Sequence, residues 1–203
     1  MTIEKGVPWG REVERPVDLR VVDGDAALAA AVERGGLRPV AVRGGDLART
    51  INAAPIADRT RLMALPIDLV EVRLDGSDPL VACAHVVVHA PWWRGGWLRE
   101  RVLVALNAEY LGGRDLAPRG HPDDGRVEVL ECSASMGVRQ RLTAERRSRR
   151  GAHLPHPDLR MRSTDAARWE LERAGVVRVD GRRVGRARTI ELRVRPDAAV
   201  LYA

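Results

Sequence analysis

The polar segment between two apolar runs, residues 102–106 and 127–130, holds acidic residues placed to do chemistry. Both runs fit buried strands, and their connection is longer and more polar than a hairpin turn requires. It contains Asp123 and Asp124 directly before Gly125. Aspartate side chains bond nearby backbone and glycine accepts positive φ, so this sequence predicts a sharp turn. The turn would present carboxylate oxygens to a cation, an arginine or a helix N-terminus, although a solvated turn has the same pattern.

Two turns nearer the N-terminus suggest a different chemistry, the binding of phosphate. Each turn joins a short apolar strand to a helix and combines glycine with aspartate. At such helix starts, backbone N–H groups can hold a phosphate. The candidate cofactor-binding residues are Gly24, Asp25, Gly44, Gly45 and Asp46.

The histidines and cysteines do not form a recognisable metal motif. His85 and His89 lie four residues apart in an apolar, strand-like run with no third ligand nearby, so we expect core or edge histidines and no metal site. The other three, in predicted loops, are left open: His121, His153 and His156. The spacing of Cys83 and Cys132 matches neither a metal knuckle nor a disulfide framework, which favours reduced thiols in a cytosolic protein.

Composition sets further limits on the class of protein. The 203 residues are 45% hydrophobic, so the chain can bury a sizeable core and most simply forms one domain with a small appendage. The net charge is +6, and Lys5 is the only lysine among 34 basic residues, an arginine bias that GC-rich coding would also produce. We expect neither an export signal nor a membrane span, because the N-terminus is polar and the longest apolar run, 80–90, is short and interrupted by histidines.

Hydrophobic periodicity and turn residues predict the elements that must position these groups. Strands are expected at 17–22, 37–42, 67–74, 80–89, 102–106, 127–130, 168–172, 176–179, 191–195 and 198–202, and helices at 26–33, after 46 and at 135–150. Asp180-Gly181 is the strongest hairpin signal. The predicted organisation is an extended arm over residues 1–16, an α/β remnant over 17–55 and a mainly β body over 56–203.

Two groups of side chains have both a structural and a functional interpretation. Trp92, Trp93 and Trp97 lie in one loop, and in a chain without phenylalanine we expect them to pack in the core or at its edge rather than form a wall for a ligand. The arginines of the 139–150 segment suit a helix C-terminus, so we expect a solvated basic face before a contact with phosphate or membrane.

Three segments in order, GGRDLAPRGHPDDGRVEV (112–129), GAHLPHPDLRMRS (151–163) and VRVDGRRVG (177–185), resemble the C-terminal half of the bacterial diacylglycerol kinase and lipid kinase family. LPIDLVEV (65–72) is similar to a strand of that family, DGDAAL (23–28) to its GGDGT-L nucleotide motif, and RGGDLARTI (43–51) to its GTxND-x-A-R segment. The resemblance covers about residues 17–203.

This resemblance implies an α+β fold: a mainly antiparallel two-layer β-sandwich with a small α/β N-terminal remnant. It also implies a reaction, ATP- and Mg²⁺-dependent transfer of phosphate to a diacylglycerol-like hydroxyl, in which Asp124 and Asp180 would be the catalytic residues.

The chain departs from the family pattern in three places. Asp23, Ala26 and Ala27 replace residues of the nucleotide motif, which puts a carboxylate where phosphates would approach. Arg182 stands where the family has the acid of its DGE hairpin, and arginine is not a general base at neutral pH. Only 22 residues precede Asp23, fewer than the strand-helix repeats of the family need. We therefore expect a truncated nucleotide-binding region.

Three functions follow from these observations. The favoured hypothesis is a lipid-kinase-like protein that has lost phosphotransfer and acts as a binding or partner-interaction module, and the alternative is an active kinase whose nucleotide domain is minimal or supplied by another chain. Binding of nucleic acid through the arginine-rich helix ranks last, because no accompanying motif is present. The expected partners are a lipid or an anionic membrane surface, with a homodimer left open, in a cytoplasmic protein that is peripheral to the membrane at most.

Overall fold

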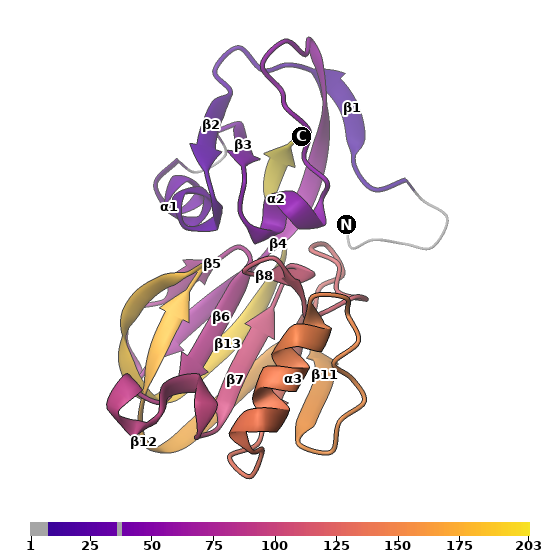
Figure 1. Cartoon of the computed structure of the whole chain (residues 1–203). Helices are drawn as coiled ribbons and strands as arrows, with labels where there is room; N and C mark the ends of the chain where they lie inside the picture. The colour runs from indigo at the N-terminus through magenta and orange to yellow at the C-terminus, as the bar shows by residue number, and fades with distance from the viewer. Residues whose placement is uncertain (1–7, 36–37) are drawn as a thin grey trace.

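Two long antiparallel strands, β4 (Arg61–Leu74) and β13 (Arg182–Tyr202), form the backbone of the fold (Figure 1). They pair from Ile190 opposite Leu74 to Tyr202 opposite Ala64, with one irregularity between Arg195 and Ala199. The sequence predicts two strands in place of β13, and the irregularity falls between them. The computed structural model describes residues 8–35 and 38–203.

Below the middle of these strands, the sheet continues through the order β13-β12-β6-β7-β10-β11, all antiparallel. The additional elements of this part are β5 (Leu80–Ala82), β6 (His85–His89), η1 (Trp92–Arg94), η2 (Gly96–Leu98), β7 (Val102–Leu106), β8 (Tyr110–Leu111), β9 (Arg114–Asp115), β10 (Val127–Cys132), α3 (Val138–Ser148), β11 (Leu159–Thr164) and β12 (Ala166–Val179). Asp180 and Gly181, both with positive φ, make the predicted turn between β12 and β13.

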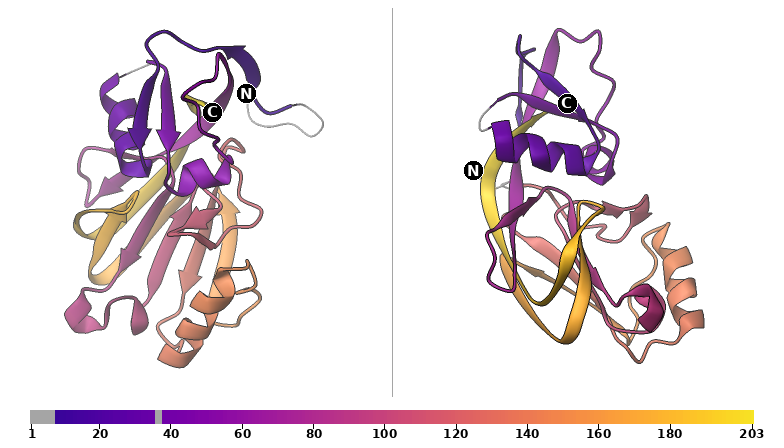
Figure 2. Two further views of the ribbon diagram at one scale, coloured as in Figure 1. Left: turned by 45° about the horizontal axis from the view of Figure 1, so that its top comes forward. Right: turned by 90° about the vertical axis from the view of Figure 1, so that its left-hand side faces the viewer.

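The curvature of this sheet brings β12 and β13 over one face of β6, β7 and β10, and buried side chains fill the space between the two layers. Val88, Leu103, Val129, Val177 and Ile190 are each at most 2% exposed and belong to one cluster. The predicted fold class is therefore confirmed: α+β, mainly antiparallel, with two layers around an aliphatic core. In Figure 2, right, α3 lies on one outer side of this part and β13 on the opposite side.

The N-terminal part packs on the upper ends of β4 and β13 (Figure 1). Its elements are β1 (Arg11–Glu14), β2 (Arg20–Asp23), α1 (Asp25–Gly35), β3 (Val40–Arg43) and α2 (Asp46–Thr50). β2 pairs parallel with β3, and β3 meets the end of β13 at Leu201. Leu28, Leu47, Ile67 and Leu201 are completely buried in a second cluster, so β4 and β13 belong to both parts.

The segment predicted as an arm includes β1, which pairs with β4. Trp9 anchors this segment to the body, because its Nε1 donates to the Pro66 carbonyl at 3.1 Å. Residues 1–7, the start of the predicted arm, lie outside the described residues. In the described part of the chain, every helix is too short or too polar to span a bilayer.

Candidate functional site

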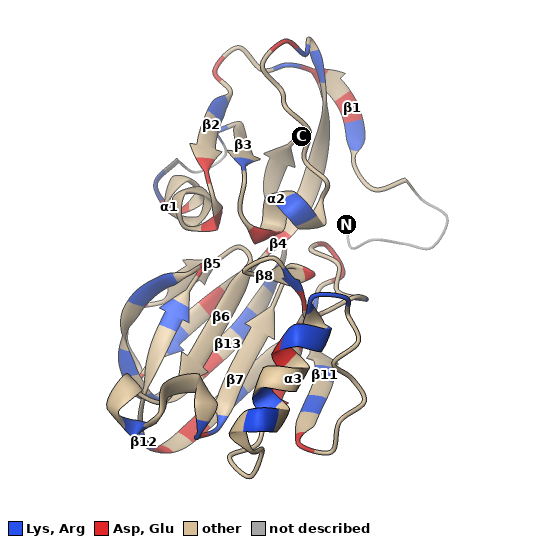
Figure 3. Cartoon of the chain, viewed as in Figure 1, with Lys and Arg blue, Asp and Glu red and all other residues tan. Residues whose placement is uncertain are grey.

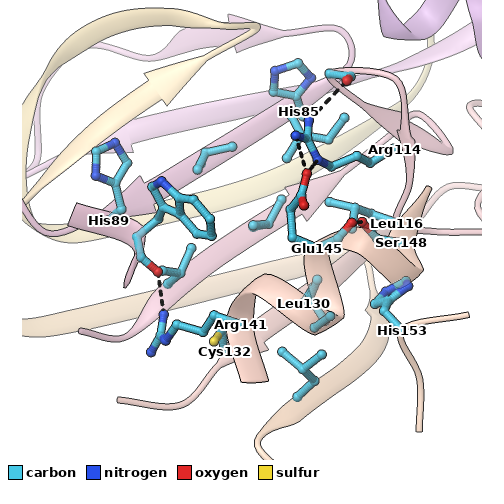
Figure 4. Close-up of a pocket in the computed structure, with 18 of the residues that line it drawn as sticks. His85, His89, Arg114, Leu116, Leu130, Cys132, Arg141, Glu145, Ser148 and His153 are labelled. Carbon is cyan, nitrogen blue, oxygen red and sulfur yellow. Dashed lines mark hydrogen bonds and ion pairs between the residues drawn. The ribbon is translucent and has the colours of Figure 1, made fainter. Parts of the chain in front are cut away.

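β6, β7 and β10 pack one face against β12 and β13 and turn the other face toward helix α3. The side chains on this other face only partly fill the space beneath the helix. Side chains alternate across a strand, so residues between the core positions point away from the main core. They form a separate cluster with Leu106, Leu116 and Leu130 among its buried members. Above them lies a cavity of about 620 Å³ (Figure 4).

The cavity walls are mainly apolar. They are formed by side chains from the sheet, the 111–116 loop and α3, including Val87, Val104, Leu116, Leu130, Met136, Ala144 and Leu159. Trp97 lies among the lining residues at one end, and Asp25, Asp46, His85 and Asp180 at the other. The cavity is thus largely apolar, with one strongly acidic end and a few charged side chains, those of Arg114, Arg141 and Glu145, on the side of α3.

A buried arginine fixes the start of α3 over the cavity. Arg141 is 4% exposed, and its guanidinium donates to four carbonyls: Met136 at 2.9 Å, Trp97 at 2.6 Å, Glu100 at 2.8 Å and Ser133 at 2.6 Å. For this residue the expected solvated basic face is wrong, because its planar fork of donors satisfies carbonyls that would otherwise lack partners. The other arginines of α3 colour the helix blue in Figure 3.

The middle of α3 is held by an ion pair to the β8–β9 hairpin. Arg114 Nε donates to Glu145 Oε1 at 2.7 Å, and Figure 4 shows the pair at the rim of the cavity. The Arg114 guanidinium lowers the pKa of Glu145. The charges of Arg114 and Glu145 therefore compensate each other.

The three tryptophans of the 91–98 loop do not pack in the core. Trp92, Trp93 and Trp97 are 82%, 56% and 46% exposed, and Trp169 is the buried tryptophan of the main core. The expectation that they pack in the core or at its edge is wrong for Trp92, which is the most exposed, and Trp97 instead lines the cavity, as the alternative of a wall for a ligand would have it. Two consecutive 3₁₀ turns around Gly95, which has φ 94°, turn the loop outward.

At the polar end of the cavity, Asp180 holds together the start of β6. Its carboxylate accepts three backbone N–H groups, from Cys83 at 2.8 Å and from Ala84 and His85 at 2.9 Å each. Burial raises the pKa of Asp180, and the same burial raises that of Cys83. Asp180 is thus a structural acceptor in the conformation described.

Asp25 has an equivalent role toward α2. Its Oδ2 accepts the N–H of Asp46 at 2.7 Å and its Oδ1 that of Leu47 at 3.0 Å, while burial raises its pKa. A Cβ at Gly45 would lie 2.6 Å from Asp25 Oδ1, so only glycine fits this approach. The N–H groups that could hold a phosphate at α2 are occupied by the chain's own carboxylate.

Asp46 is the third aspartate at the polar end of the cavity, and its carboxylate holds the Gly112-Gly113 turn. Its Oδ2 accepts Gly112 N–H at 2.7 Å and its Oδ1 accepts Gly113 N–H at 3.2 Å. His85 Nδ1 lies 3.8 Å from Asp46 Oδ2. The structure thus brings together Asp25, Asp46 and Asp180 from three distant segments, and it adds His85, which sequence reasoning treated as a core residue.

The Asp123-Asp124 turn forms a second acidic region around Asp68 of β4. Asp68 Oδ2 accepts Gly125 N–H at 2.6 Å, and Asp124 Oδ1 accepts Arg126 N–H at 2.9 Å. Burial raises the pKa of Asp123 and of Asp124 to about 6. Neither aspartate is among the residues that line the cavity.

The remaining predicted residues occupy the turns around the polar end. Gly24 and Gly44 have φ of 77° and 71°, with open space where a Cβ would stand. Asp23 makes a bidentate pair with Arg43, at 2.7 and 3.0 Å, and both side chains are exposed. Arg182 is exposed on the hairpin after Gly181. In Figure 3, red marks the acidic residues at the ends of β2, α1 and α2 that face the lower part.

Neither the comparison with protein-family models nor that with curated proteins finds a match. Solved structures do match. A crystal structure described as a putative diacylglycerol kinase from Bacillus anthracis str. Sterne aligns with a TM-score of 0.66 at 14% identity, covering 91% of this chain and 77% of that one. Another diacylglycerol kinase structure from the same organism aligns with a TM-score of 0.61 at 14% identity, covering 91% and 75%. The chain has the fold of these proteins, and the resemblance predicted from the sequence is confirmed at that level.

Proposed function

We propose that the protein binds the acyl portion of a lipid in the cavity beneath α3 and does not transfer phosphate to it. The supporting observation is the cavity itself. Its volume of about 620 Å³ lies in the range typical of ligand sites, about 300–1,000 Å³, and its walls are mainly apolar, above all on the side of the sheet. An alkyl chain placed there would move from water to a mainly apolar surface.

The polar end favours a particular head group. Asp25, Asp46 and Asp180 face it, and of the described residues no arginine or lysine forms an ion pair with any of them. A phosphate would meet three carboxylates, whereas a hydroxyl or an amine could donate hydrogen bonds to them. As long as no cation is bound at this end, the preferred ligand is therefore a neutral hydroxylated lipid, such as a mono- or diacylglycerol, rather than a phosphorylated one.

The contacts of the candidate nucleotide residues support the loss of phosphotransfer. Asp25 occupies the N–H groups of α2, and Asp23 with its Arg43 partner replaces a glycine of the motif. Arg182 provides no base. Because phosphoryl transfer depends on positioned donors around ATP and Mg²⁺, the described residues fit ATP poorly.

Binding can be tested with an environment-sensitive fluorescent acyl probe that is displaced by monooleoylglycerol. Ala144→Trp fills the cavity from α3, and Leu142→Trp adds the same ring on the exposed side of that helix. We expect Ala144→Trp to lower probe affinity at least about tenfold and Leu142→Trp to leave it unchanged, since only the first competes for space in the cavity. Equal binding by both variants would place the lipid elsewhere.

Phosphotransfer is tested separately, with radiolabelled ATP, Mg²⁺ and diacylglycerol in mixed micelles. We expect no labelled lipid above background. Robust Mg²⁺-dependent labelling by the purified chain would refute this half of the proposal and leave lipid binding intact.

One observation favours the alternative, an active lipid kinase: three carboxylates stand where the hydroxyl of a bound lipid would lie. An active enzyme must bind nucleotide, so ATP-Mg²⁺ should then raise the melting temperature with concentration by mass action. The favoured proposal predicts no such increase.

The exposed loop tryptophans suggest how the protein reaches its lipid. Trp92 and Trp93 are exposed on the loop before β7, and Arg186 of β13 stacks over the Trp93 ring at 4.5 Å. Tryptophan and arginine together suit the surface of an anionic bilayer. Co-sedimentation with phosphatidylglycerol-containing vesicles should fall when Trp92 and Trp93 are both changed to serine. An unchanged bound fraction would argue against this surface.

A further inference from the structure

Side chains from three elements converge at the polar end of the cavity: Asp25 from α1, Asp46 from α2 and His85 from β6. One ligand atom of each, two carboxylate oxygens and an imidazole nitrogen, lies within 4.8 Å of the other two. The His85 side chain is 5% exposed, and its Nδ1 has no hydrogen-bond partner among the described residues. The distance of 3.8 Å to Asp46 Oδ2 is too long for a hydrogen bond.

We propose that Asp25, Asp46 and His85 bind a divalent transition-metal ion, with Zn²⁺ the preferred probe. A buried nitrogen without a partner beside two carboxylates is costly when the space between them is empty. A cation between the three side chains would give His85 Nδ1 a partner. The two carboxylates and the imidazole would then each lie at bonding distance from the same ion.

The local charge favours a cation. Asp180 faces the same end of the cavity, so three carboxylates are gathered there, two of them buried and that of Asp46 13% exposed. Within 8–35 and 38–203, the recorded ion pairs give these carboxylates a single basic neighbour, His85. Buried charges are paired or coordinate metals in folded proteins, and one divalent ion would offset most of this excess.

The two aspartates are already oriented for coordination. Backbone N–H groups of Asp46 and Leu47 fix the Asp25 carboxylate, and those of Gly112 and Gly113 fix that of Asp46. A carboxylate oxygen has two lone pairs, so each oxygen keeps one after accepting its hydrogen bond. Partners of this kind orient metal ligands and raise affinity.

The donor set indicates the kind of ion. Imidazole nitrogen suits zinc and other first-row transition ions, whereas Mg²⁺ and Ca²⁺ prefer oxygen ligands alone. Three protein ligands leave a further position of a tetrahedral Zn²⁺ open, and here the neighbouring space is the cavity. An oxygen atom of a bound molecule or a water could occupy that position.

The test is isothermal titration of the chelator-treated full chain with Zn²⁺, and separately with Mg²⁺. We expect one Zn²⁺ per chain and no measurable Mg²⁺ affinity under the same conditions. His85→Gln should weaken Zn²⁺ binding at least about a hundredfold, because it removes the only nitrogen ligand. His89→Gln is the matched control on the same strand and should bind like the wild type, since its Nδ1 lies 2.6 Å from the Ala90 carbonyl oxygen, away from the aspartates.

A second measurement needs no variant of the site. In long-range ¹H–¹⁵N spectra of wild-type protein labelled at histidine, saturating Zn²⁺ should shift the Nδ1 resonance of a single imidazole, that of His85. The proposal is overturned by equal Zn²⁺ affinity of folded His85→Gln and wild type, or by spectral shifts confined to the other four histidines. Metal binding here does not require lipid in the cavity, so failure of one experiment leaves the other proposal standing.

Discussion

The two faces of β6, β7 and β10 are built from the same kinds of residue and behave differently. On one face Val86, Val88 and Val129 pack against β12 and β13, with at most 2% of each residue exposed. On the other, Val87 and Val102 are only partly buried beneath α3, and the cavity separates them from the helix. A second sheet layer closes the first face, whereas a single helix with a buried arginine spans the second.

This difference separates stability from function. Close packing on the first face supplies the burial that holds the fold together. The second face leaves apolar surface without partner atoms, which contributes less to stability than a filled core would. The cavity beneath α3 is therefore space that a ligand can occupy.

The largest expected effect compares one residue from each face. Ile190→Ala, in the closed core, should lower the free energy of unfolding by about 2–5 kcal/mol because the surrounding side chains cannot collapse into the space. Leu130→Ala, which borders the cavity, should cost less than Ile190→Ala, since one side of Leu130 already lacks neighbours. Urea unfolding measures both changes. Equal losses would show that the two faces are packed alike.

The next effect compares the two candidate catalytic aspartates. Asp180→Ala leaves three buried N–H groups without an acceptor and should cost about 2–3 kcal/mol. Asp124→Ala removes one contact, to Arg126 N–H two residues away, and should cost about 0.5 kcal/mol. The expectation fails if Asp124→Ala is as destabilising as Asp180→Ala in thermal unfolding.

A smaller effect concerns the support of α3. Arg141→Lys keeps the charge but cannot donate to four carbonyls in the plane of a guanidinium, so we expect a loss of about 1–2 kcal/mol. The same variant should bind the acyl probe more weakly, because α3 forms one wall of the cavity. Arg146→Lys, on the exposed side, is the matched control and should match the wild type in both assays.

The smallest effect depends on pH and tests the Asp123-Asp124 turn. The pKa of Asp123 is raised from 3.8 to about 6, so between these values the folded state binds more protons than the unfolded state and stability falls as pH rises. Asp123→Asn removes this penalty. The full shift corresponds to about 3 kcal/mol, and solvent next to the turn screens the charge, so the variant should be more stable than wild type by about 1 kcal/mol at pH 8 and equal to it below about pH 3. An advantage that is the same at both pH values would exclude titration of Asp123 as its cause.

The sequence predicts the elements that depend on local chemistry. α1, β7, β10 and the Asp180-Gly181 turn follow from apolar periodicity, capping aspartate and the preference of Asp-Gly for positive φ. The resemblance of the ordered motifs to the lipid kinase family predicts the fold class as well. Each single signal lies within a few residues of sequence, so it is readable without any tertiary contact.

Other features depend on distant contacts and were not predictable in the same way. His85 acquires Asp25 and Asp46 as neighbours only when three segments meet, and Trp92 points outward because of backbone turns rather than its own hydrophobicity. The cavity depends on how far α3 stands from the sheet. One signal was available: β6 and β7 are apolar at successive positions, which indicates strands covered on both faces.

The central claim, that the cavity beneath α3 receives an acyl chain, is tested most directly by photolabelling. A monoacylglycerol carrying a diazirine in its chain would be irradiated with the protein, and labelled peptides identified by mass spectrometry. The account predicts labels on 102–106, 127–132 and 138–148, which are lost when excess monooleoylglycerol competes. Labels confined to the exposed 91–98 loop, or unaffected by competition, would contradict it.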